Sequence, residues 1–135
     1  MPITGERAVT LHVCVTCRHG DEPDETPRPG ARLYRALVTA LSRREDDVPV
    51  RIEPVECLSV CKRPCTVAVS SPGRWTYVYG DLDPENAAET ILGGLSRYAQ
   101  TADGIVPWRE RPAEFRRGVI ARIPPALTIV KEAAE

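Results

Sequence analysis

The sequence predicts an α/β sandwich with the element order β-α-β-β-β-α and an extended C-terminal tail. An alternating apolar segment precedes a segment of helical periodicity, and three further β-type runs lead to a second helical segment. The chain has 135 residues, of which 42% are hydrophobic, which suffices for one domain with its own core. We expect residues 1–100 to form this domain, and residues 101–135 to form a tail that packs on it or on a partner subunit.

The first half of the chain predicts a β-α-β unit. Residues 8–16 (AVTLHVCVT) alternate apolar and polar side chains with the period of a strand. Residues 18–30 are polar and rich in proline and acids, as loops are, and residues 31–45 repeat apolar side chains at helical spacing. Residues 48–56 read as a second strand. Because strand–helix–strand units form right-handed crossovers between parallel strands, we expect these two strands to be parallel.

The second half predicts a hairpin and a helix. Two β-type runs within residues 65–80 are separated by a Pro-Gly turn signal. Residues 81–100 have a helical apolar stripe, for which Asp83 is the expected N-cap and Pro84 the first helical residue. Residues 101–135 show no sustained period, although the part to about residue 125 is apolar enough to pack against the domain. The whole arrangement is a sandwich of the thioredoxin type.

The five cysteines lie at the predicted strand ends. Cys14 and Cys17 end the first strand, Cys57 and Cys61 follow the second, and Cys65 begins the third. The carboxyl ends of parallel strands lie at one edge of a sheet, so two cysteine loops that are far apart in sequence meet in space. Four thiolates at a shared edge can hold a metal centre. We therefore predict Cys14, Cys17, Cys57 and Cys61 as ligands.

Two metal centres suit four thiolates. A 2Fe-2S cluster has two irons that each take two thiolates, and structural zinc takes four, usually from two C-x2-C knuckles. The C-x3-C of Cys57 and Cys61 runs on to a third cysteine and lacks a knuckle glycine, which favours the iron–sulfur cluster and leaves zinc as the alternative. Cys65 is the alternative ligand, since it also begins an apolar strand that would draw it into the fold.

Other roles for the thiols fit the sequence less well. In a dithiol oxidoreductase the C-x2-C motif leads directly into a helix, whereas thirteen loop residues follow Cys17 here. Buried structural thiols would not gather in two tight clusters. An isolated histidine such as His12 is typical of a hydrogen-bonded surface residue rather than a ligand. The cations Arg18, Lys62 and Arg63 either favour reduction of an anionic cluster or are solvated loop charges.

Composition excludes several classes of function. The net charge of −1 gives no indication of nucleic-acid binding, and no apolar run is long enough to enter a membrane. The N-terminus has no signal-peptide pattern, so we expect a cytoplasmic protein in a reducing compartment, where structural disulfides are rare. Neither a Ser-His-Asp set nor a phosphate-binding glycine loop is evident. We expect a carrier or metal-binding protein rather than an enzyme.

These motifs resemble known families. A strand with two cysteines, a helix, a strand leading into C-x3-C, a hairpin and a final helix are similar to the thioredoxin-like 2Fe-2S ferredoxins, from Val9 to Ala99, although their first two cysteines are usually further apart. "VECLSVCKRPCTVAV", "WTYVYGDLDPE" and "VPWRERPAEFRRGVIARIPP" more closely resemble a bacterial family of predicted metal-binding proteins without an assigned function, whose members are often associated with cobalamin biosynthesis or cobalt uptake.

The resemblance implies a function near corrin metabolism. We expect an electron-transfer protein with one 2Fe-2S cluster, serving cobalamin or cobalt metabolism, that passes single electrons to a larger enzyme. Related ferredoxins often dimerise, so a homodimer is expected, with a redox partner that the sequence does not identify. The alternatives are a protein that delivers zinc or cobalt to a partner, and a dithiol oxidoreductase that acts through Cys14 and Cys17.

Overall fold

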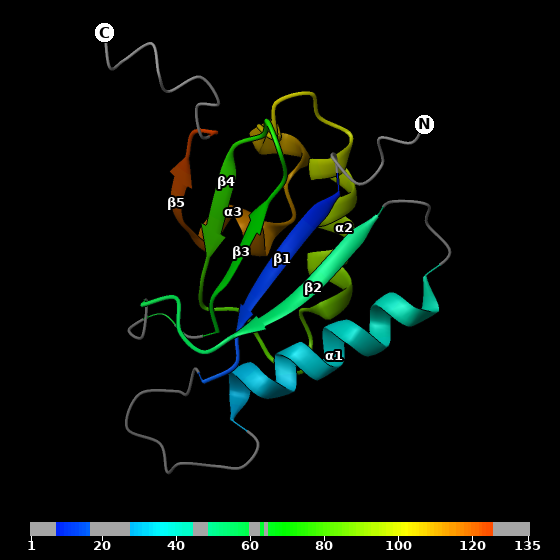
Figure 1. Ribbon diagram of the computed structural model, residues 1–135, viewed down its shortest axis with the longest axis vertical. Coiled ribbons are helices and arrows are strands. Elements are labelled where there is room, and N and C mark those ends of the chain that lie inside the picture. Colours follow the sequence, from blue (N-terminus) through cyan, green and yellow to red (C-terminus); the bar gives the residue numbers. More distant parts are fainter. Residues whose placement is uncertain (1–7, 17–27, 45–48, 60–62, 64, 126–135) are drawn as a thin grey trace, which may run out of the picture.

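The computed structural model describes residues 8–16, 28–44, 49–59, 63 and 65–125, which form a five-stranded sheet with helices packed on it (Figure 1). The order of elements confirms the predicted β-α-β-β-β-α arrangement and adds a short helix and a strand after it. The elements are β1 (Val9–Cys14), α1 (Pro29–Arg43), β2 (Val50–Val55), β3 (Val67–Ser70), β4 (Thr76–Tyr79), α2 (Ala88–Ala99), the 3-10 turn η2 (Trp108–Glu110), α3 (Ala113–Arg117) and β5 (Val119–Ile123).

β1 is an inner strand of the sheet. The strand order is β2-β1-β3-β4-β5, so β1 lies between β2 and β3. It pairs in parallel with β2, from Val9 opposite Val50 to Cys14 opposite Val55, and antiparallel with β3. The expected parallel pair is therefore confirmed. The arrowheads of β1 and β2 end together at one edge of the sheet (Figure 1).

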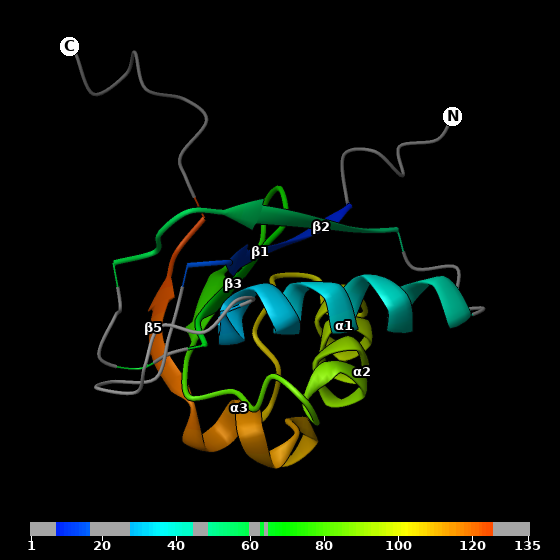
Figure 2. The same cartoon turned by 90° about the horizontal axis from the view of Figure 1, so that it is seen from below.

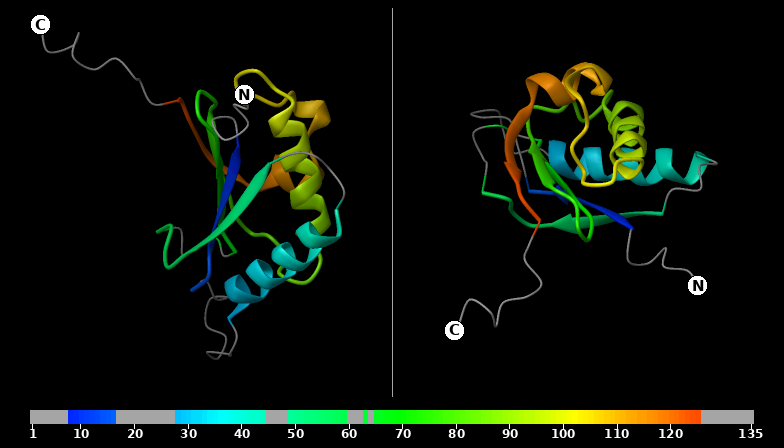
Figure 3. Two further views of the ribbon diagram at one scale, coloured as in Figure 1. Left: turned by 45° about the vertical axis from the view of Figure 1, so that its right-hand side comes forward. Right: turned by 90° about the horizontal axis from the view of Figure 1, so that it is seen from above.

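The helices α1, α2 and α3 lie on the same face of the sheet (Figures 2 and 3). The apolar side chains of β1 alternate as the sequence predicts, and Val9, Leu11 and Val13 have no exposed surface. They share one core cluster with the apolar stripes of α1 and α2, which supply Leu33, Leu37, Ile91, Leu92 and Leu95. Each fully buried aliphatic side chain contributes about 1.5–3 kcal/mol. Within the described ranges, no helix combines the length and apolar character needed to cross a bilayer.

The start of α2 differs from the sequence prediction. The helix begins at Ala88, and its N-cap residue Ala87 makes no side-chain cap hydrogen bond. Asp83 closes a turn before the helix instead. Its Oδ1 accepts a hydrogen bond from the Glu85 N–H at 2.9 Å, and its Oδ2 accepts one from the Asn86 side-chain amide at 2.9 Å. The N-cap prediction is wrong because aspartate is equally suited to stabilising such turns.

Residues 101–125 add structure that periodicity did not predict. β5 pairs antiparallel with β4, from Thr76 opposite Ile123, with an irregularity between Val78 and Tyr79. α3 places the Phe115 ring parallel to the Tyr79 ring, with 3.8 Å between the centroids. Elements of five residues contain too few periods to be recognised in the sequence. This part of the expected tail therefore extends the sheet and contributes to the core.

Two adjacent glycines in α2 have different surroundings and give a matched test of this packing. A Cβ added to Gly94 would collide with the Phe115 ring, whereas one added to Gly93 would meet nothing within 4 Å. We expect Gly93→Ala to raise the free energy of unfolding by about 1 kcal/mol, because alanine favours helix. Gly94→Ala should lower it by about 1–3 kcal/mol through overpacking. Urea unfolding measures both, and equal stabilisation by the two substitutions would contradict the packing of α3 on α2.

Candidate metal centre

Three described cysteines lie at one end of the sheet, which we call the thiol edge. Cys14 is the last residue of β1, and Cys57 comes two residues after the end of β2. Cys65 comes two residues before β3, whose first residue Val67 pairs with Val13 in antiparallel register. The carboxyl ends of β1 and β2 and the amino end of β3 therefore share this edge. The topology brings together the chain segments that carry all three thiols.

Cys14 is buried, although the alternation of the strand places its side chain on the other face of the sheet from the core-facing side chain of Val13. Its N–H donates to the Thr66 carbonyl oxygen at 3.1 Å, and its Sγ donates to the Glu56 carbonyl oxygen at 3.8 Å. The Thr16 hydroxyl donates to the same Glu56 carbonyl. Chain from three segments thus surrounds Cys14: the end of β1, the residues after β2 and the residues before β3. This enclosure results from tertiary packing, which the period of a single strand does not contain.

Cys57 is exposed, and its sulfur accepts a backbone hydrogen bond. The Ser59 N–H donates to the Cys57 Sγ at 3.1 Å. Ser59 has a φ of 61°, in the left-handed region that is uncommon for residues other than glycine. A hydrogen bond to a thiolate favours its charged form, and hydrogen bonds to sulfur also tune iron–sulfur clusters. The turn after Cys57 therefore provides a feature that a metal-bound thiolate uses.

Cys65 differs from Cys57 in its burial. Its side chain has no exposed surface and belongs to the hydrophobic core cluster. Burial raises the pKa of the Cys65 thiol to about 11, an effect that the positive charge of Arg32 partly offsets. The nearby Glu85 carboxylate adds to the increase. Cys65 is therefore an un-ionised core thiol at neutral pH in the metal-free chain, as its predicted position at the start of an apolar strand suggests.

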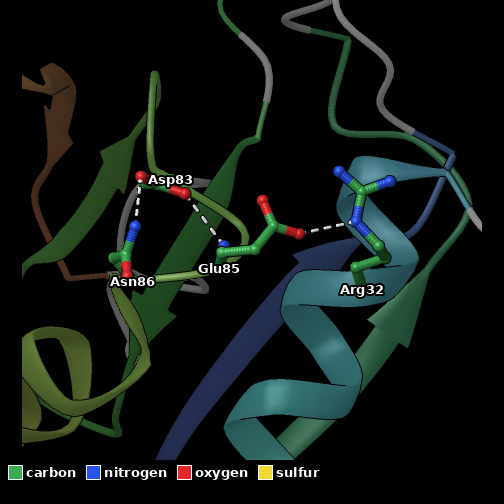
Figure 4. A network of polar contacts seen from close by, with 4 residues as sticks. All are labelled: Arg32, Asp83, Glu85 and Asn86. Carbon is green, nitrogen blue, oxygen red and sulfur yellow. Dashed lines mark hydrogen bonds and ion pairs between the residues drawn. The ribbon is translucent and has the colours of Figure 1, made fainter.

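The first turn of α1 brings basic side chains to the thiol edge. The Arg28 Nη1 donates to the Thr16 carbonyl oxygen at 3.0 Å. One turn further, the Arg32 Nε donates to the Glu85 Oε2 at 2.7 Å, and Glu85 belongs to the turn that Asp83 closes (Figure 4). Exposed pairs of this kind contribute at most about 1 kcal/mol. The N-terminal end of α1 also carries partial positive charge, so negative charge at the thiol edge is favoured.

Ser59 and Thr66 are site residues that neither composition nor spacing predicts. Each acts through the backbone: Ser59 through its N–H on a cysteine sulfur, and Thr66 through its carbonyl on a cysteine N–H. Backbone groups are common to all residue types, so composition and spacing do not reveal them. For Ser59, the sequence signal that could have been used is its position two residues after Cys57.

The predicted ligand set is described only in part. The structure places Cys14 and Cys57 at the ends of adjacent parallel strands. Among the residues it describes, no group of three or more His, Cys, Asp or Glu side chains is arranged to hold a metal ion. Four residues of the sequence argument lie outside the described ranges: Cys17, Cys61, Arg18 and Lys62. Ligation by Cys14, Cys17, Cys57 and Cys61 therefore stays a prediction.

A comparison with protein families places the chain. The family described as "Protein of unknown function (DUF1636)" matches residues 11–125, a range that includes every cysteine. The chain belongs to this family. No curated protein matches the DUF1636 chain.

The fold is similar to that of solved ferredoxin structures. The DUF1636 chain is similar to a thioredoxin-like [2Fe-2S] ferredoxin from Aquifex aeolicus, with a TM-score of 0.57 and 20% identity over 90% of this chain and 98% of that one. A cysteine-to-serine variant of the thioredoxin-like ferredoxin from Aquifex aeolicus matches with a TM-score of 0.53 and 19% identity, over 84% of this chain and 98% of that one. The predicted thioredoxin-like ferredoxin fold is thereby confirmed.

Burial predicts different reactivities for two thiols of the metal-free DUF1636 protein. Alkylating agents attack the thiolate, and Cys57 is exposed whereas Cys65 is buried with a pKa of about 11. We expect iodoacetamide at pH 8 to modify Cys57 at least about tenfold faster than Cys65. Unfolding in urea should remove the difference. Mass mapping of the labelled peptides measures both rates, and equal rates in the folded protein would contradict the packing of Cys65.

Proposed function

We propose that the chain is an electron carrier that holds one 2Fe-2S cluster through Cys14, Cys17, Cys57 and Cys61. The observation that carries this proposal is the parallel register of β1 and β2, in which Cys14 lies opposite Val55. The sequence supplies one pair of cysteines at the end of β1 and one pair after β2. A 2Fe-2S cluster takes two thiolates at each iron, so two pairs from adjacent strand ends fit its needs.

The described residues fit such a group in three respects. The Ser59 N–H already points at the Cys57 sulfur, at 3.1 Å. Cys14 lies in a buried position, where its sulfur is shielded from water and from oxidants. The N-terminal end of α1 and its N-cap residue Arg28 provide positive charge near the same edge, which favours an anionic centre. Because Cys14 donates to the Glu56 carbonyl as a thiol, ligation requires it to lose this proton.

Exposure assigns different tasks to the two sides of the centre. When bound, the cluster supplies a site that accepts and releases single electrons. Cys14 would bind the cluster from a buried position within the fold, whereas Cys57 is exposed to solvent. A redox partner therefore has access from the side of Cys57. The fold similarity to the [2Fe-2S] ferredoxin from Aquifex aeolicus supports the electron-carrier proposal.

Metal and sulfide analysis tests the proposal directly. Protein purified without air should be red-brown and contain about two irons and two acid-labile sulfides per chain. Reduction should be a one-electron process. Colourless protein with one zinc per chain would overturn the proposal in favour of a structural or metal-delivery site, because zinc binds four thiolates without sulfide. Disulfide turnover at Cys14 and Cys17 without any metal would instead support a dithiol oxidoreductase.

Single substitutions test which thiols bind the cluster. We expect Cys57→Ser and Cys61→Ser each to abolish the visible spectrum of the wild-type cluster, because each removes a thiolate ligand. Cys65→Ser is the matched control within the same segment and should leave that spectrum intact. Absorption of anaerobically purified variants, normalised to protein and iron, measures the effect. Loss of the spectrum in Cys65→Ser with its retention in Cys61→Ser would reassign the ligands.

The partner and pathway follow from the resemblance stated above. We propose that the protein is a homodimer and that it supplies electrons to an enzyme that acts on cobalt or a corrin. Light scattering of the intact chain should give twice the mass of one chain, and a monomer would contradict the dimer. The reduced protein should pass one electron to a cobalt corrin. Failure of that transfer, with the cluster fully reduced, would contradict the pathway.

A further inference from the structure

Arg63 and Asp81 join the cysteine segment to the turn that follows β4. The Arg63 Nε donates to the Asp81 Oδ2 at 2.7 Å. The main chains of the two residues are joined as well, because the Asp81 N–H donates to the Arg63 carbonyl oxygen at 3.3 Å. The Thr66 hydroxyl donates to the same carbonyl at 2.8 Å. We call this set of contacts the Arg63–Asp81 latch.

The turn after β4 has the backbone that the latch requires. Asp81 has a φ of 60°, a left-handed conformation that favours glycine, asparagine and aspartate. Gly80 before it is buried, and a Cβ there would lie 2.7 Å from the Arg63 carbonyl oxygen and 2.6 Å from the Ile120 side chain. The Gly80 N–H also donates to the Gly118 carbonyl oxygen at 2.9 Å. The turn is therefore bonded to Gly118, just before β5, on one side, and on the other side it leaves room for the Arg63 main chain.

The latch is connected to the thiols of the edge. In the sequence, Arg63 lies two residues before Cys65 and six after Cys57. Thr66, whose hydroxyl binds the Arg63 carbonyl, accepts the Cys14 N–H on its own carbonyl at 3.1 Å. A continuous set of hydrogen bonds thus runs from Asp81 through Arg63 and Thr66 to Cys14. Displacing Arg63 would release the end of the cysteine segment nearest β3.

We propose that Arg63 and Asp81 are positioning residues that fix the main chain at Arg63 and, through Thr66, the backbone of Cys14, so that the thiol edge keeps the arrangement used to bind the cluster. This inference rests on the proposed function. The Arg63 and Asp81 side chains are 36% and 51% exposed, and an ion pair at such exposure is weak by itself. Here the pair also keeps two hydrogen bonds to the Arg63 carbonyl oxygen in place, from the Asp81 N–H and the Thr66 hydroxyl. Its loss therefore affects the path of the chain as well as the local charge.

Two substitutions distinguish an electrostatic effect of Arg63 and Asp81 on the cluster from an effect on the position of the chain. Arg63→Gln removes a cation and Asp81→Asn removes an anion, so a purely electrostatic effect on an anionic cluster would have opposite signs in the two variants. A positioning effect has the same sign in both, because either substitution breaks the same pair. Asparagine tolerates the left-handed backbone as aspartate does, so Asp81→Asn leaves the turn itself unstrained. Arg97→Gln is the matched control, since Arg97 forms an ion pair with Glu110 at 3.7 Å with similar exposure.

The experiment combines hydrogen exchange and cluster stability in the full chain. In the metal-free protein, amide exchange in peptides from Cys57 to Cys65 should be about two- to fivefold faster in Arg63→Gln and in Asp81→Asn than in the wild type. In the iron-loaded protein, both variants should lose their visible absorption to an iron chelator faster by a similar factor. The double variant should be no worse than either single one, because the two substitutions remove one interaction. Arg97→Gln should behave as the wild type does.

Three results would overturn the latch: effects of opposite sign in the two variants, additive effects in the double variant, or rates that match those of Arg97→Gln. Failure of the proposed function would give a different experimental result. If the wild-type chain binds no iron or sulfide, the electron-carrier proposal fails and the role of the latch in cluster binding fails with it. The exchange rates of the metal-free chain then still show whether Arg63 and Asp81 hold the segment.

Discussion

The parallel pairing of β1 and β2 is the constraint on which the thiol edge depends. Its register ends with Cys14 opposite Val55, and the ladder continues as the Val15 N–H donates to the Val55 carbonyl oxygen at 2.9 Å. The residues that follow each strand therefore begin next to each other. An antiparallel pair would place the two cysteine groups at opposite ends of the sheet. The crossover through α1 makes the parallel arrangement possible, and the helix packs against both strands.

The remaining elements surround the residues that follow β1 and β2. β3 runs antiparallel to β1, so the residues before it reach the same edge, and Thr66 binds the Cys14 backbone there. The turn after β4 reaches this edge too and binds Arg63. The helices α1, α2 and α3 lie on one face of the sheet (Figure 2). The N-cap residue of α1, Arg28, donates to the Thr16 carbonyl oxygen at this edge. The edge is thus enclosed by segments from most of the chain, while Cys57 stays exposed.

The sequence predicts those features that repeat along one element. The alternation of Val9, Leu11 and Val13 identifies β1, and the parallel pairing follows from the strand–helix–strand order. Apart from this pairing, features that depend on contacts between elements were not predictable. Asp83 suits an N-cap and a turn equally well, so only the fold decides between them. β5 is an edge strand of five residues that its pairing with β4 stabilises, and so periodicity does not reveal it.

The central claim is that two thiol pairs from adjacent strand ends bind one 2Fe-2S cluster. Iron X-ray absorption of the anaerobically purified chain tests this claim most directly, because it reports the atoms around each iron. The account predicts a first coordination sphere of sulfur alone and a second iron as the nearest metal neighbour. Nitrogen or oxygen ligands at the iron, or the absence of an iron neighbour, would contradict it.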